Sequence, residues 1–360
     1  MKKRILVFHT MVAPYRVDFF NRLWHDYDMT MCIDIKEDYA LLYGNIENDY
    51  EFRYETFDTH GNISTIIKYV TRMLKRCKPE VVIVSECGIV SLLVVLYRIF
   101  AFKKYRIISI IDDSYDQLIN KNHFSKKHSA AEKILVPRFD EVINVEPNVS
   151  EFFQREYGKG VYFPIIRDER KYRDVLVNSL ENSNNYVKKY NLNEKKVILY
   201  VGRFVKIKNI ERLIEAFNSI ERDDIKLVLV GAGEEENSLR DLAGNDKILF
   251  TGKLTGNYLY GWYNVADIFV LPSLVEPFGA VTNEALMSGC KCIVSKAAGS
   301  ACLIEDGVNG FKITPTDVND IREKLLITIN GVKKGGGAIV KDNLMRTTFE
   351  SEFNKITKIL

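Results

Sequence analysis

The sequence has no long hydrophobic run, little proline and almost no net charge. Its longest apolar stretch, residues 88–102, is interrupted by Arg98 and falls short of the ~20 residues that a membrane-spanning helix requires. We therefore expect this stretch to form a buried helix or one that touches a bilayer surface. With 8 prolines, 46% apolar and 28% charged residues among 360, the composition excludes disordered and fibrous proteins. A formal net charge of only +3 gives no indication of nucleic-acid binding driven by bulk charge.

Cysteine and histidine are scarce and scattered. None of the six cysteines has the spacing of a zinc knuckle, and Cys292 lies in a predicted buried strand, so we expect reduced, mostly packed thiols of a cytoplasmic protein. The five histidines show no metal-ligand spacing. His9, at the end of the first predicted strand, either lines a cleft or has a structural role. The basic N-terminus is followed by an apolar run, residues 5–8, that is too short for a secretory signal and predicts a strand.

Apolar, β-branched runs alternate with helical patterns along the chain. Continuous apolar strands separated by amphipathic helices form parallel sheets that are covered on both faces. Two successive series of such strands therefore predict an α/β fold with two doubly wound, Rossmann-like domains facing each other across a cleft. We expect an N-terminal domain of residues 1–170 and a C-terminal domain of residues 171–342, and a terminal helix over 343–360 that packs back on the first domain.

The segment 271–295, LPSLVEPFGAVTNEALMSGCKCIVS, places two glutamates around the start of a predicted helix. Glu276 lies in the loop after a strand, and Gly279 lets a ligand approach the backbone closely. The N–H groups of residues 280–282 are expected to form an anion site at the helix N-terminus. Glu284 lies about 7 Å further along the axis, a distance suited to holding a polar group beside a bound phosphate. Each glutamate alone could simply face solvent, but their combination with Pro-Phe-Gly favours a ligand site.

A second candidate site lies in residues 200–217, YVGRFVKIKNIERLIEAF. Gly202 ends a strand, Arg203 follows at once, and Lys208 stands at the start of a helix. A guanidinium that binds bidentately and an ammonium point charge together suit a diphosphate, although a solvated basic loop would have the same composition. Gly231 belongs to an incomplete dinucleotide-binding pattern. A tight turn is the simpler interpretation of this glycine, which could also border a nucleobase.

These segments resemble the donor half of a retaining glycosyltransferase of the GT-B architecture, in glycosyltransferase family 4 (glycosyl transferases group 1). The resemblance covers about residues 195–312, in the order of the family's motifs. It implies transfer of a sugar from a UDP- or GDP-linked donor to a hydroxyl of a cell-surface polysaccharide or lipid-linked glycan. It also implies that neither cofactor nor metal is required, because cationic side chains stabilise the departing diphosphate. The matching segments are YVGRFVKIKNI, LVLVGAGEEENSLRDL, ILFTGKL, ADIFVLPSLVEPFGAVTNEALMSGCKCIVS and LIEDGVNGF.

The resemblance implies a role for each matching position. Glu276 would hold hydroxyls of the donor sugar, and Arg203 and Lys208 would neutralise the diphosphate. These three residues form the implied catalytic set. Glu284 would bind the ribose hydroxyls. The other donor contacts that it implies are Gly231, Phe278, Gly279, Ala280 and Val281.

The first half of the chain resembles the family less closely. Residues 9–23, HTMVAPYRVDFFNRL, are similar to one branch in which Ala-Pro-Tyr-Arg replaces a glycine-rich loop. Arg16 is therefore a candidate contact for the acceptor or a phosphate. Many members carry a histidine after a middle strand, but here Asp112 and Asp113 stand at that place, so Asp112 is our second candidate on the acceptor side. The acidic pair could also suggest a metal, but helix capping is the simpler explanation.

Two other functions stay open. A nucleotide-sugar epimerase or synthase on the same scaffold would release product without an acceptor, and a non-catalytic binder would retain only the nucleotide site. We expect a cytoplasmic protein without a nucleic-acid partner. The basic helix 66–78 and the apolar segment 88–102 could contact the anionic inner face of the cell membrane, although an ordinary amphipathic helix explains the same pattern.

Overall fold

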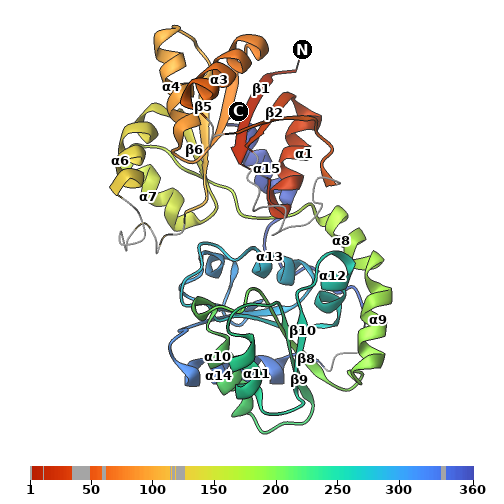
Figure 1. Ribbon diagram of the computed structural model, residues 1–360. Coiled ribbons are helices and arrows are strands. Elements are labelled where there is room, and N and C mark those ends of the chain that lie inside the picture. Colours follow the sequence, from red (N-terminus) through yellow and green to blue (C-terminus); the bar gives the residue numbers. More distant parts are fainter. Residues whose placement is uncertain are drawn as a thin grey trace. The chain divides into compact units, whose positions relative to one another are not determined.

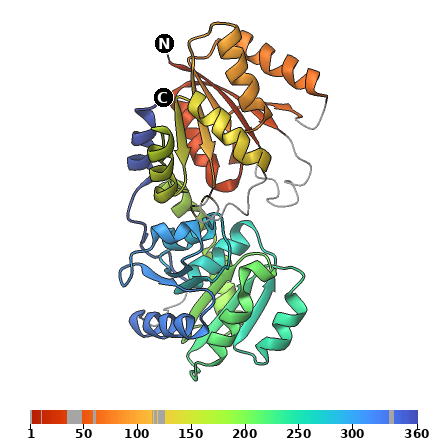
Figure 2. The same ribbon diagram turned by 90° about the vertical axis from the view of Figure 1, so that its left-hand side faces the viewer.

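The protein folds into two compact α/β units, shown in the computed structural model of Figure 1. Unit 1 comprises Met1–Arg167 and Phe349–Leu360, and unit 2 comprises Asp168–Thr348. The chain therefore enters unit 2 once and returns, and Figure 2 shows the C-terminal helix, in blue, among the red to yellow elements of unit 1. The structure describes residues 2–10, 12–34, 49–58, 62–113, 115, 118, 126–333 and 338–360.

The described part of unit 1 contains a seven-stranded sheet in the order β3-β2-β1-β4-β5-β6-β7. Every pair of neighbouring strands is parallel, so the carboxyl ends of all strands lie at one edge. The strands are β1 (Arg4–Thr10), β2 (Asp28–Asp34), β3 (Tyr54–Phe57), β4 (Val81–Ser85), β5 (Arg106–Ile111), β6 (Glu141–Asn144) and β7 (Val161–Tyr162). The helices are η1 (Pro14–Arg16), α1 (Val17–Asp26), α3 (Ile63–Cys77), α4 (Ile89–Phe100), α6 (Lys126–Leu135), η4 (Val136–Arg138), α7 (Pro147–Tyr157) and α15 (Phe349–Thr357).

Helices cover both faces of the unit 1 sheet. Leu6 and Phe8 of β1 belong to the hydrophobic core that α3, α4 and α7 complete. Ile5 and Val7 point to the opposite face, because side chains alternate along a strand, and they are buried as well. The C-terminal helix α15 packs beside α1.

Unit 2 is built around a six-stranded parallel sheet in the order β10-β9-β8-β11-β12-β13. Its strands are β8 (Lys196–Val201), β9 (Ile225–Val230), β10 (Ile248–Gly252), β11 (Ile268–Leu271), β12 (Lys291–Ser295) and β13 (Gly310–Ile313). Its described helices are α8 (Glu169–Asn178), α9 (Leu180–Lys189), η5 (Lys206–Lys208), α10 (Ile210–Asn218), α11 (Glu236–Ala243), α12 (Gly256–Val265), α13 (Ala280–Met287), η6 (Gly299–Leu303) and α14 (Val318–Gly331).

The two faces of the unit 2 sheet have separate hydrophobic cores. Leu199 and Phe269 pack with α8, α9, α12 and α13, whereas Ile198 and Val270 pack with α10, α11 and α14. This arrangement explains why the strands read as continuous apolar runs, since each of their side chains meets one helical layer or the other. The predicted α/β fold with doubly wound, parallel sheets is confirmed for each unit.

The strand order locates the functional edge of each sheet. In an open α/β sheet, ligands bind beyond the carboxyl ends of the strands, where the strand order reverses. The order reverses between β8 and β11 in unit 2 and between β1 and β4 in unit 1. The loops that follow these four strands are therefore the places to look for chemistry.

The apolar stretch 88–102 forms α4 and the turn after it, and one side of α4 is buried through Ser91, Val94 and Val95. Within the described ranges, none of the helices has the length and apolar character needed to cross a bilayer.

Candidate functional site

Two strand-to-helix loops of unit 2 meet where its strand order reverses. β8 and β11 are neighbours, with Ile198 opposite Ile268. The loop after β8 carries Arg203 and Lys208, and the loop after β11 carries Glu276. The structure therefore brings the cationic and acidic elements, which lie about 70 residues apart in the sequence, to the same edge of one sheet.

Asn209 fastens these two loops together. Its backbone has a φ of 57°, in the left-handed region that asparagine tolerates better than most residues. The buried side chain donates hydrogen bonds through Nδ2 to the carbonyl oxygens of Pro272 (3.0 Å) and Pro315 (2.7 Å), and its Oδ1 accepts one from Arg212 (2.6 Å). Asn209 is not among the residues predicted from the sequence, where its only signal is its position directly after Lys208.

Lys208 and Glu276 form an ion pair between Nζ and Oε2. Their side chains are only 13% and 12% exposed, so much of the hydration of both charges has been lost and their mutual attraction offsets that loss. Ser273 lies 3.5 Å from the same carboxylate oxygen, and a backbone hydrogen bond from Leu274 to Ile207 (2.8 Å) aligns the two loops. The structure thus places these two predicted residues in direct contact.

The Pro-Phe-Gly segment after Glu276 is fixed against η6. The backbone oxygens of Glu276 and Phe278 accept hydrogen bonds from the N–H groups of Gly299 (3.2 Å) and Ser300 (2.8 Å). Gly279 has a φ of 92°, a conformation that glycine adopts far more readily than other residues. The loop is therefore held in one shape by these backbone hydrogen bonds and by the buried side chain of Phe278.

Helix α13 begins directly after Gly279 and points its N-terminus toward this loop. No acidic residue lies in its first turn, and Ala280 and Val281 are partly exposed. The first turn of a helix leaves N–H groups without intrahelical partners, and the helix dipole makes this end favourable for anions. The predicted anion-binding segment is thus at a helix N-terminus in the structure.

Glu284 lies in the second turn of α13 against two buried tyrosines. Tyr263 of α12 donates a hydrogen bond to Glu284 Oε2 (3.1 Å), and Tyr172 of α8 donates one to the Glu284 backbone oxygen (3.0 Å). Burial and the nearby Glu284 charge raise the pKa of Tyr263 well above its usual value, so this phenol stays protonated and remains a donor at neutral pH. Tyr263 is not among the residues predicted from the sequence, because nothing in its local sequence distinguishes it from a core aromatic residue.

The guanidinium of Arg203 is exposed and has no side-chain partner in the part of the chain that the structure describes. Its backbone oxygen accepts a hydrogen bond from Tyr200 (3.2 Å). Burial and the charge of Glu276 raise the pKa of Tyr200, while Arg203 acts in the opposite direction. The charges of Glu276 and Arg203 therefore both lie near the Tyr200 hydroxyl, at the end of β8.

Gly231 serves the packing of two backbones. A Cβ at Gly231 would lie 1.9 Å from the backbone oxygen of Gly202, and a Cβ at Gly233 would lie 2.2 Å from that of Phe204. Any larger residue would push apart the loops after β8 and β9. This close approach is enough to explain both glycines, and contact between Gly231 and a nucleobase stays a prediction.

In unit 1, the two predicted acceptor-side residues are also in contact. Arg16 of η1 is only 1% exposed, and its Nη2 donates to Asp112 Oδ1 (2.5 Å). Asp112 follows β5 and is about one-third exposed. Arg16 Nε and Nη1 are buried and have no hydrogen-bond partner among the described residues, although most buried polar atoms in folded proteins have one.

His9 and Glu86 lie beside this pair. His9 donates through Nδ1 to the backbone oxygen of Thr10 (2.6 Å), and burial lowers the pKa of its ring, so the imidazole is neutral near pH 7. Glu86 Oε1 accepts a hydrogen bond from the Asp112 N–H (3.1 Å). Burial, together with Asp113 and Asp112, raises the pKa of Glu86 well above its usual value. Glu86 is not among the residues predicted from the sequence, although a glutamate directly after a buried strand is a usable signal.

The described residues contain no group of histidine, cysteine or acidic side chains arranged to hold a metal ion.

Comparison with known sequences finds a family match for part of the chain. Residues 182–334 match the model of the family described as glycosyl transferases group 1. An uncharacterized glycosyltransferase of Methanocaldococcus jannaschii is 38% identical over 133 residues, 36% of this chain and 34% of that protein. A GDP-mannose-dependent alpha-mannosyltransferase of Corynebacterium glutamicum is 37% identical over 131 residues, 36% of this chain and 30% of that protein. The matched region thus spans about a third of the length of these relatives.

Solved structures resemble the whole chain in fold. The lipopolysaccharide outer core galactosyltransferase WaaB in its apo form has a TM-score of 0.68 at 19% identity, covering 99% of this chain and 100% of that one. The Anabaena protein HepE in complex with UDP has a TM-score of 0.76 at 16% identity, covering 99% and 98%. At such low identity these likenesses establish the fold, which is that of GT-B glycosyltransferases.

Proposed function

From the match of residues 182–334 to the family model described as glycosyl transferases group 1, we propose that the chain is a glycosyltransferase. It moves a sugar from a nucleotide diphosphate sugar to the hydroxyl of an acceptor. The observation that carries this proposal is the Lys208–Glu276 ion pair beside the N-terminus of α13, with exposed Arg203 on the same loop as Lys208. Together they supply cations and helix N–H groups for a diphosphate and a carboxylate for sugar hydroxyls.

Two donor nucleotides are consistent with this site. HepE has been crystallised with UDP and with UDP-glucose, whereas the Corynebacterium relative is named for GDP-mannose. Glu284, oriented by Tyr263, would accept hydrogen bonds from the ribose hydroxyls of either nucleotide. Gly231, Phe278, Gly279, Ala280 and Val281 are the further donor contacts in this proposal.

The chemistry follows from the charge that develops during transfer. Cleavage of the anomeric bond leaves positive charge on the sugar ring and negative charge on the diphosphate. Arg203, Lys208 and the first turn of α13 would stabilise that negative charge in a preorganised way. Glu276 would exchange its contact with Lys208 for donor-sugar hydroxyls as Lys208 turns to the phosphates, so that neither charge is left without a partner.

We propose retention of the anomeric configuration, with the acceptor attacking from the face that the diphosphate leaves. The departing phosphate then takes the proton of the acceptor hydroxyl, and neither a covalent glycosyl-Glu276 intermediate nor a metal ion is required. Analysis of the anomeric configuration of the product by NMR, and activity in excess EDTA, test these two points separately.

The acceptor is proposed to be a cell-surface polysaccharide or a lipid-linked glycan, available at the cytoplasmic face of the cell membrane. Two similar proteins are named for such products, the capsular polysaccharide biosynthesis glycosyltransferase of Staphylococcus aureus and the lipopolysaccharide galactosyltransferase WaaB. In unit 1, Arg16 and Asp112 are the proposed acceptor contacts. Arg16 would donate through Nε and Nη1 to a phosphate or carboxylate of the acceptor only if these atoms, which are buried in this structure, become accessible.

One experiment separates the transferase from its two alternatives. The protein is incubated with radiolabelled UDP-glucose, UDP-galactose or GDP-mannose, with and without a lipid extract as the acceptor. A transferase moves label to the extract. An epimerase or synthase converts the nucleotide sugar without the extract, and a non-catalytic binder gives no product although calorimetry detects binding of UDP or GDP. Either of the last two results would contradict the proposal.

A further inference from the structure

An exposed apolar tip lies at the end of α4 in unit 1. Leu96, Ile99 and Phe100 are exposed on this helix, and their i, i+3, i+4 spacing places them in one stripe. The turn after the helix adds Phe102. Phe100 and Phe102 are 76% and 91% exposed, and exposed apolar patches of this kind mark contact sites. Phe102 also has a φ of 51°, which is unfavourable for a bulky residue, so the turn holds this ring outward at an energetic cost.

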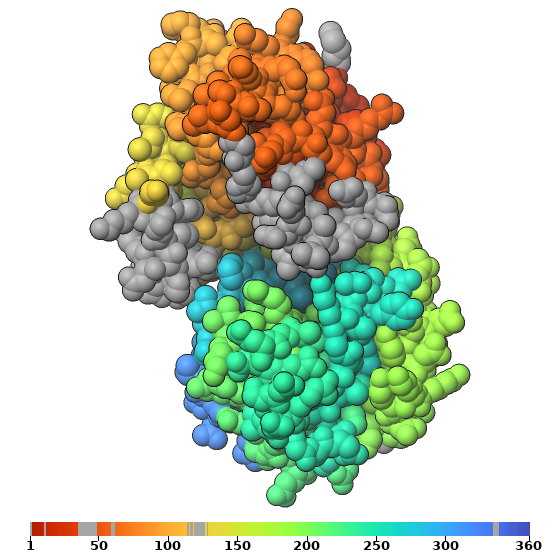
Figure 3. Space-filling model, in the orientation of Figure 1, coloured from red at the N-terminus to blue at the C-terminus, as the bar shows by residue number. Residues whose placement is uncertain are grey.

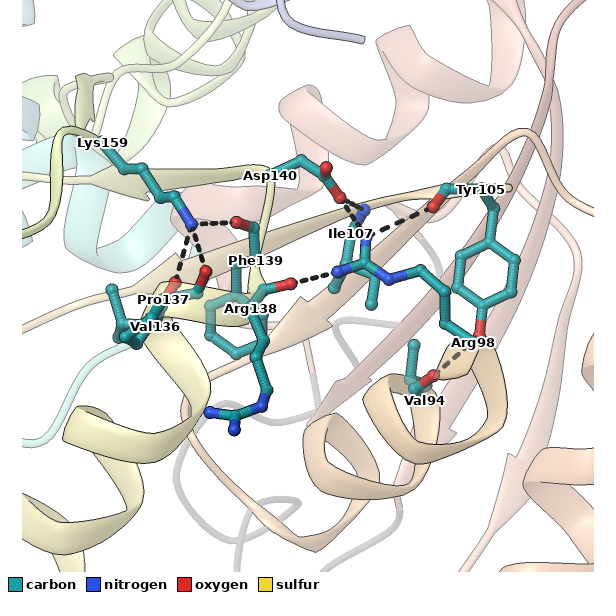
Figure 4. A network of polar contacts seen from close by, with 10 residues as sticks. All are labelled: Val94, Arg98, Tyr105, Ile107, Val136, Pro137, Arg138, Phe139, Asp140 and Lys159. Carbon is teal, nitrogen blue, oxygen red and sulfur yellow. Dashed lines mark hydrogen bonds and ion pairs between the residues drawn. The ribbon is translucent and has the colours of Figure 1, made fainter. Parts of the chain in front are cut away.

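The tip stands on a rigid base, which Figure 4 shows from close by. Arg98 donates from Nη1 to Asp140 and to the Tyr105 backbone oxygen (3.4 Å), and from Nη2 to the Arg138 backbone oxygen. The hydroxyl of Tyr105 donates back to the Val94 backbone oxygen (2.7 Å). Arg98 in the last turn of α4 and Tyr105, which follows the tip, are therefore both held by hydrogen bonds.

A second cation strengthens the same base. Lys159 Nζ donates to the backbone oxygens of Val136 (3.1 Å), Pro137 (2.9 Å) and Phe139, which belong to or follow η4 (Figure 4). The η4 segment, whose Arg138 backbone oxygen accepts the hydrogen bond from Arg98, is thus itself held in place. A contact made by Phe100 and Phe102 would lose little conformational entropy, since the turn that carries them is already ordered.

Positive charge surrounds the tip. Lys103 and Lys104 follow it directly and are exposed, as is Arg106. Over residues 61–111 the sequence has nine lysines and arginines and two glutamates. The nearby carboxylate of Asp140 accepts hydrogen bonds from Arg98 and from the N–H group of Ile107 (2.7 Å), so its negative charge is already paired.

The adjacent helix α3 extends this positive surface. It packs beside α4, and Figure 3 shows residues 63–104, in shades of orange, as a continuous area on the surface of unit 1. A shallow depression on α3 is lined by Ile67, Lys68, Thr71, Arg72, Lys75 and Arg76.

We propose that unit 1 binds the surface of an anionic lipid bilayer through this tip. Phe100 and Phe102 insert between lipid headgroups, while Lys103 and Lys104 contact anionic headgroups. The tip has four exposed apolar residues, far fewer than the roughly 20–30 residues a side of a stable protein interface, but a fluid headgroup layer can admit it. Because α4 runs back from the carboxyl end of β4, the tip lies at the edge where the strands begin, opposite to Arg16.

This inference specifies the surface for the membrane location that we proposed with the transferase function, and its test needs no transfer. The full chain is mixed with vesicles of phosphatidylcholine alone, or of phosphatidylcholine with phosphatidylglycerol, and floated on a density gradient. We expect flotation with the anionic vesicles that weakens as salt increases. Flotation that ignores both salt and anionic lipid would overturn the proposal.

Variants assign the binding to the tip. Phe100→Ser/Phe102→Ser should lower partition into anionic vesicles roughly tenfold or more, and Tyr258→Ser/Val308→Ser, a pair of exposed apolar residues in unit 2, should leave it unchanged. Equal flotation of the two variants would contradict the inference. A second result would also contradict it: the wild-type protein does not float, and sedimentation velocity finds oligomers of the wild type but monomers of the tip variant. That result would mean that the tip binds a second copy of the chain.

Insertion can be measured apart from adsorption. In a Phe102→Trp variant, anionic vesicles containing brominated phosphatidylcholine should quench and blue-shift the new tryptophan emission, with wild type as the blank for Trp24 and Trp262. Binding without quenching would refute insertion of the tip. Calorimetry with UDP and GDP should give the same result for wild type and both serine variants, so failure of the membrane contact and failure of the transferase proposal are distinguishable.

Discussion

The two units have closely related strand orders, but the pairing of their charged side chains differs at the point where that order reverses. In unit 2, Lys208 is paired with Glu276, and their loops are joined by side-chain and backbone hydrogen bonds. In unit 1, Arg16 is almost fully buried, and two of its nitrogen atoms have no partner among the described residues. The comparison teaches that the same order of strands can hold a paired, preorganised set of charges in one unit. In the other unit it holds a buried charge whose hydrogen bonds are only partly made.

This difference has a physical meaning. A charge-paired loop keeps its shape before a ligand arrives, so little reorganisation is needed during the reaction. A buried guanidinium with unpartnered N–H groups carries a desolvation penalty that a bound anion would relieve. In the function that we propose, unit 2 would therefore stabilise a developing charge, and unit 1 would recognise an anionic group on a substrate.

The largest expected effect comes from removing the cations of unit 2. Arg203→Ala and Lys208→Ala should each lower kcat by roughly 100-fold or more, the range seen when one preorganised stabilising group is lost. The matched control is Lys206→Ala in the same loop, which should keep near-normal turnover. Near-normal turnover in both Arg203→Ala and Lys208→Ala would contradict their proposed role.

The same variants should differ in stability. Lys208→Ala should lower the free energy of unfolding by about 1–3 kcal/mol, because it leaves the Glu276 carboxylate without its partner. Arg203→Ala should have no such effect, since its guanidinium is exposed. Urea denaturation of the two proteins measures the difference. Equal stability would mean that the ion pair does not offset the burial of Glu276.

The next effect concerns unit 1. Arg16→Met should raise KM for the acceptor about tenfold or more, given about 1.4 kcal/mol per tenfold change, and leave UDP or GDP affinity unchanged. Stability should stay within about 1 kcal/mol of wild type, because the variant removes a buried charge that is only partly hydrogen-bonded. Initial rates at varied acceptor concentration, with calorimetry for the nucleotide, test this. A change confined to nucleotide affinity would move Arg16 to the donor side.

A smaller effect should appear at Glu284. Tyr263→Phe should weaken UDP or GDP binding by a factor of about 3–10, the loss of one hydrogen bond worth about 1 kcal/mol. It should not weaken binding of the 2′,3′-dideoxy nucleotide, which lacks the ribose hydroxyls. Tyr172→Phe is the matched control, since its hydroxyl contacts the backbone oxygen of Glu284 (3.0 Å) and the side chain of Ser288 (3.1 Å).

Calorimetry with each nucleotide and its dideoxy form provides the measurement. If Glu284→Gln also fails to distinguish the two ligands, the ribose role of Glu284 is wrong. If Glu284→Gln distinguishes them and Tyr263→Phe does not, only the orienting role of Tyr263 is wrong.

The smallest expected effect is a pH dependence of stability from Glu86. Its pKa in the folded protein is raised by burial and by Asp113 and Asp112, so the folded state holds a proton that the unfolded state releases above about pH 4.3. Stability from this group is complete below that pH and is lost as the pH rises toward the folded pKa. Glu86→Gln should therefore gain stability relative to wild type between pH 5 and pH 8. Urea denaturation that gives the same difference at both pH values would contradict this expectation.

Much of the fold could be predicted from the sequence, because the signals are local. Runs such as residues 81–84 and 197–201 are hydrophobic at every position, which in a parallel sheet requires helices on both faces. Arg203, Lys208, Glu276 and Glu284 were identifiable because each lies next to a strand end or helix start with a recognisable motif. Their roles stay predictions.

The rest of the site depends on contacts between distant parts of the chain. Asn209 is important because it reaches Pro272 and Pro315, and Tyr263 because it reaches Glu284. No local pattern encodes such a contact, since an asparagine in a turn and a tyrosine in a helix are common without any functional role. Glu86 and Arg16 likewise acquire their unusual environments only when three strands of unit 1 align their carboxyl ends.

The order of residues alone thus determined which segments become strands and helices, since hydrophobic periodicity acts over a few residues. It also determined which charged groups stand at their ends. Only the tertiary structure decided which of those charges become paired, as in Lys208 and Glu276, and which stay incompletely partnered, as in Arg16. The reason is that desolvation and hydrogen bonding depend on what surrounds a group in space, and those surroundings are assembled from segments that are far apart along the chain.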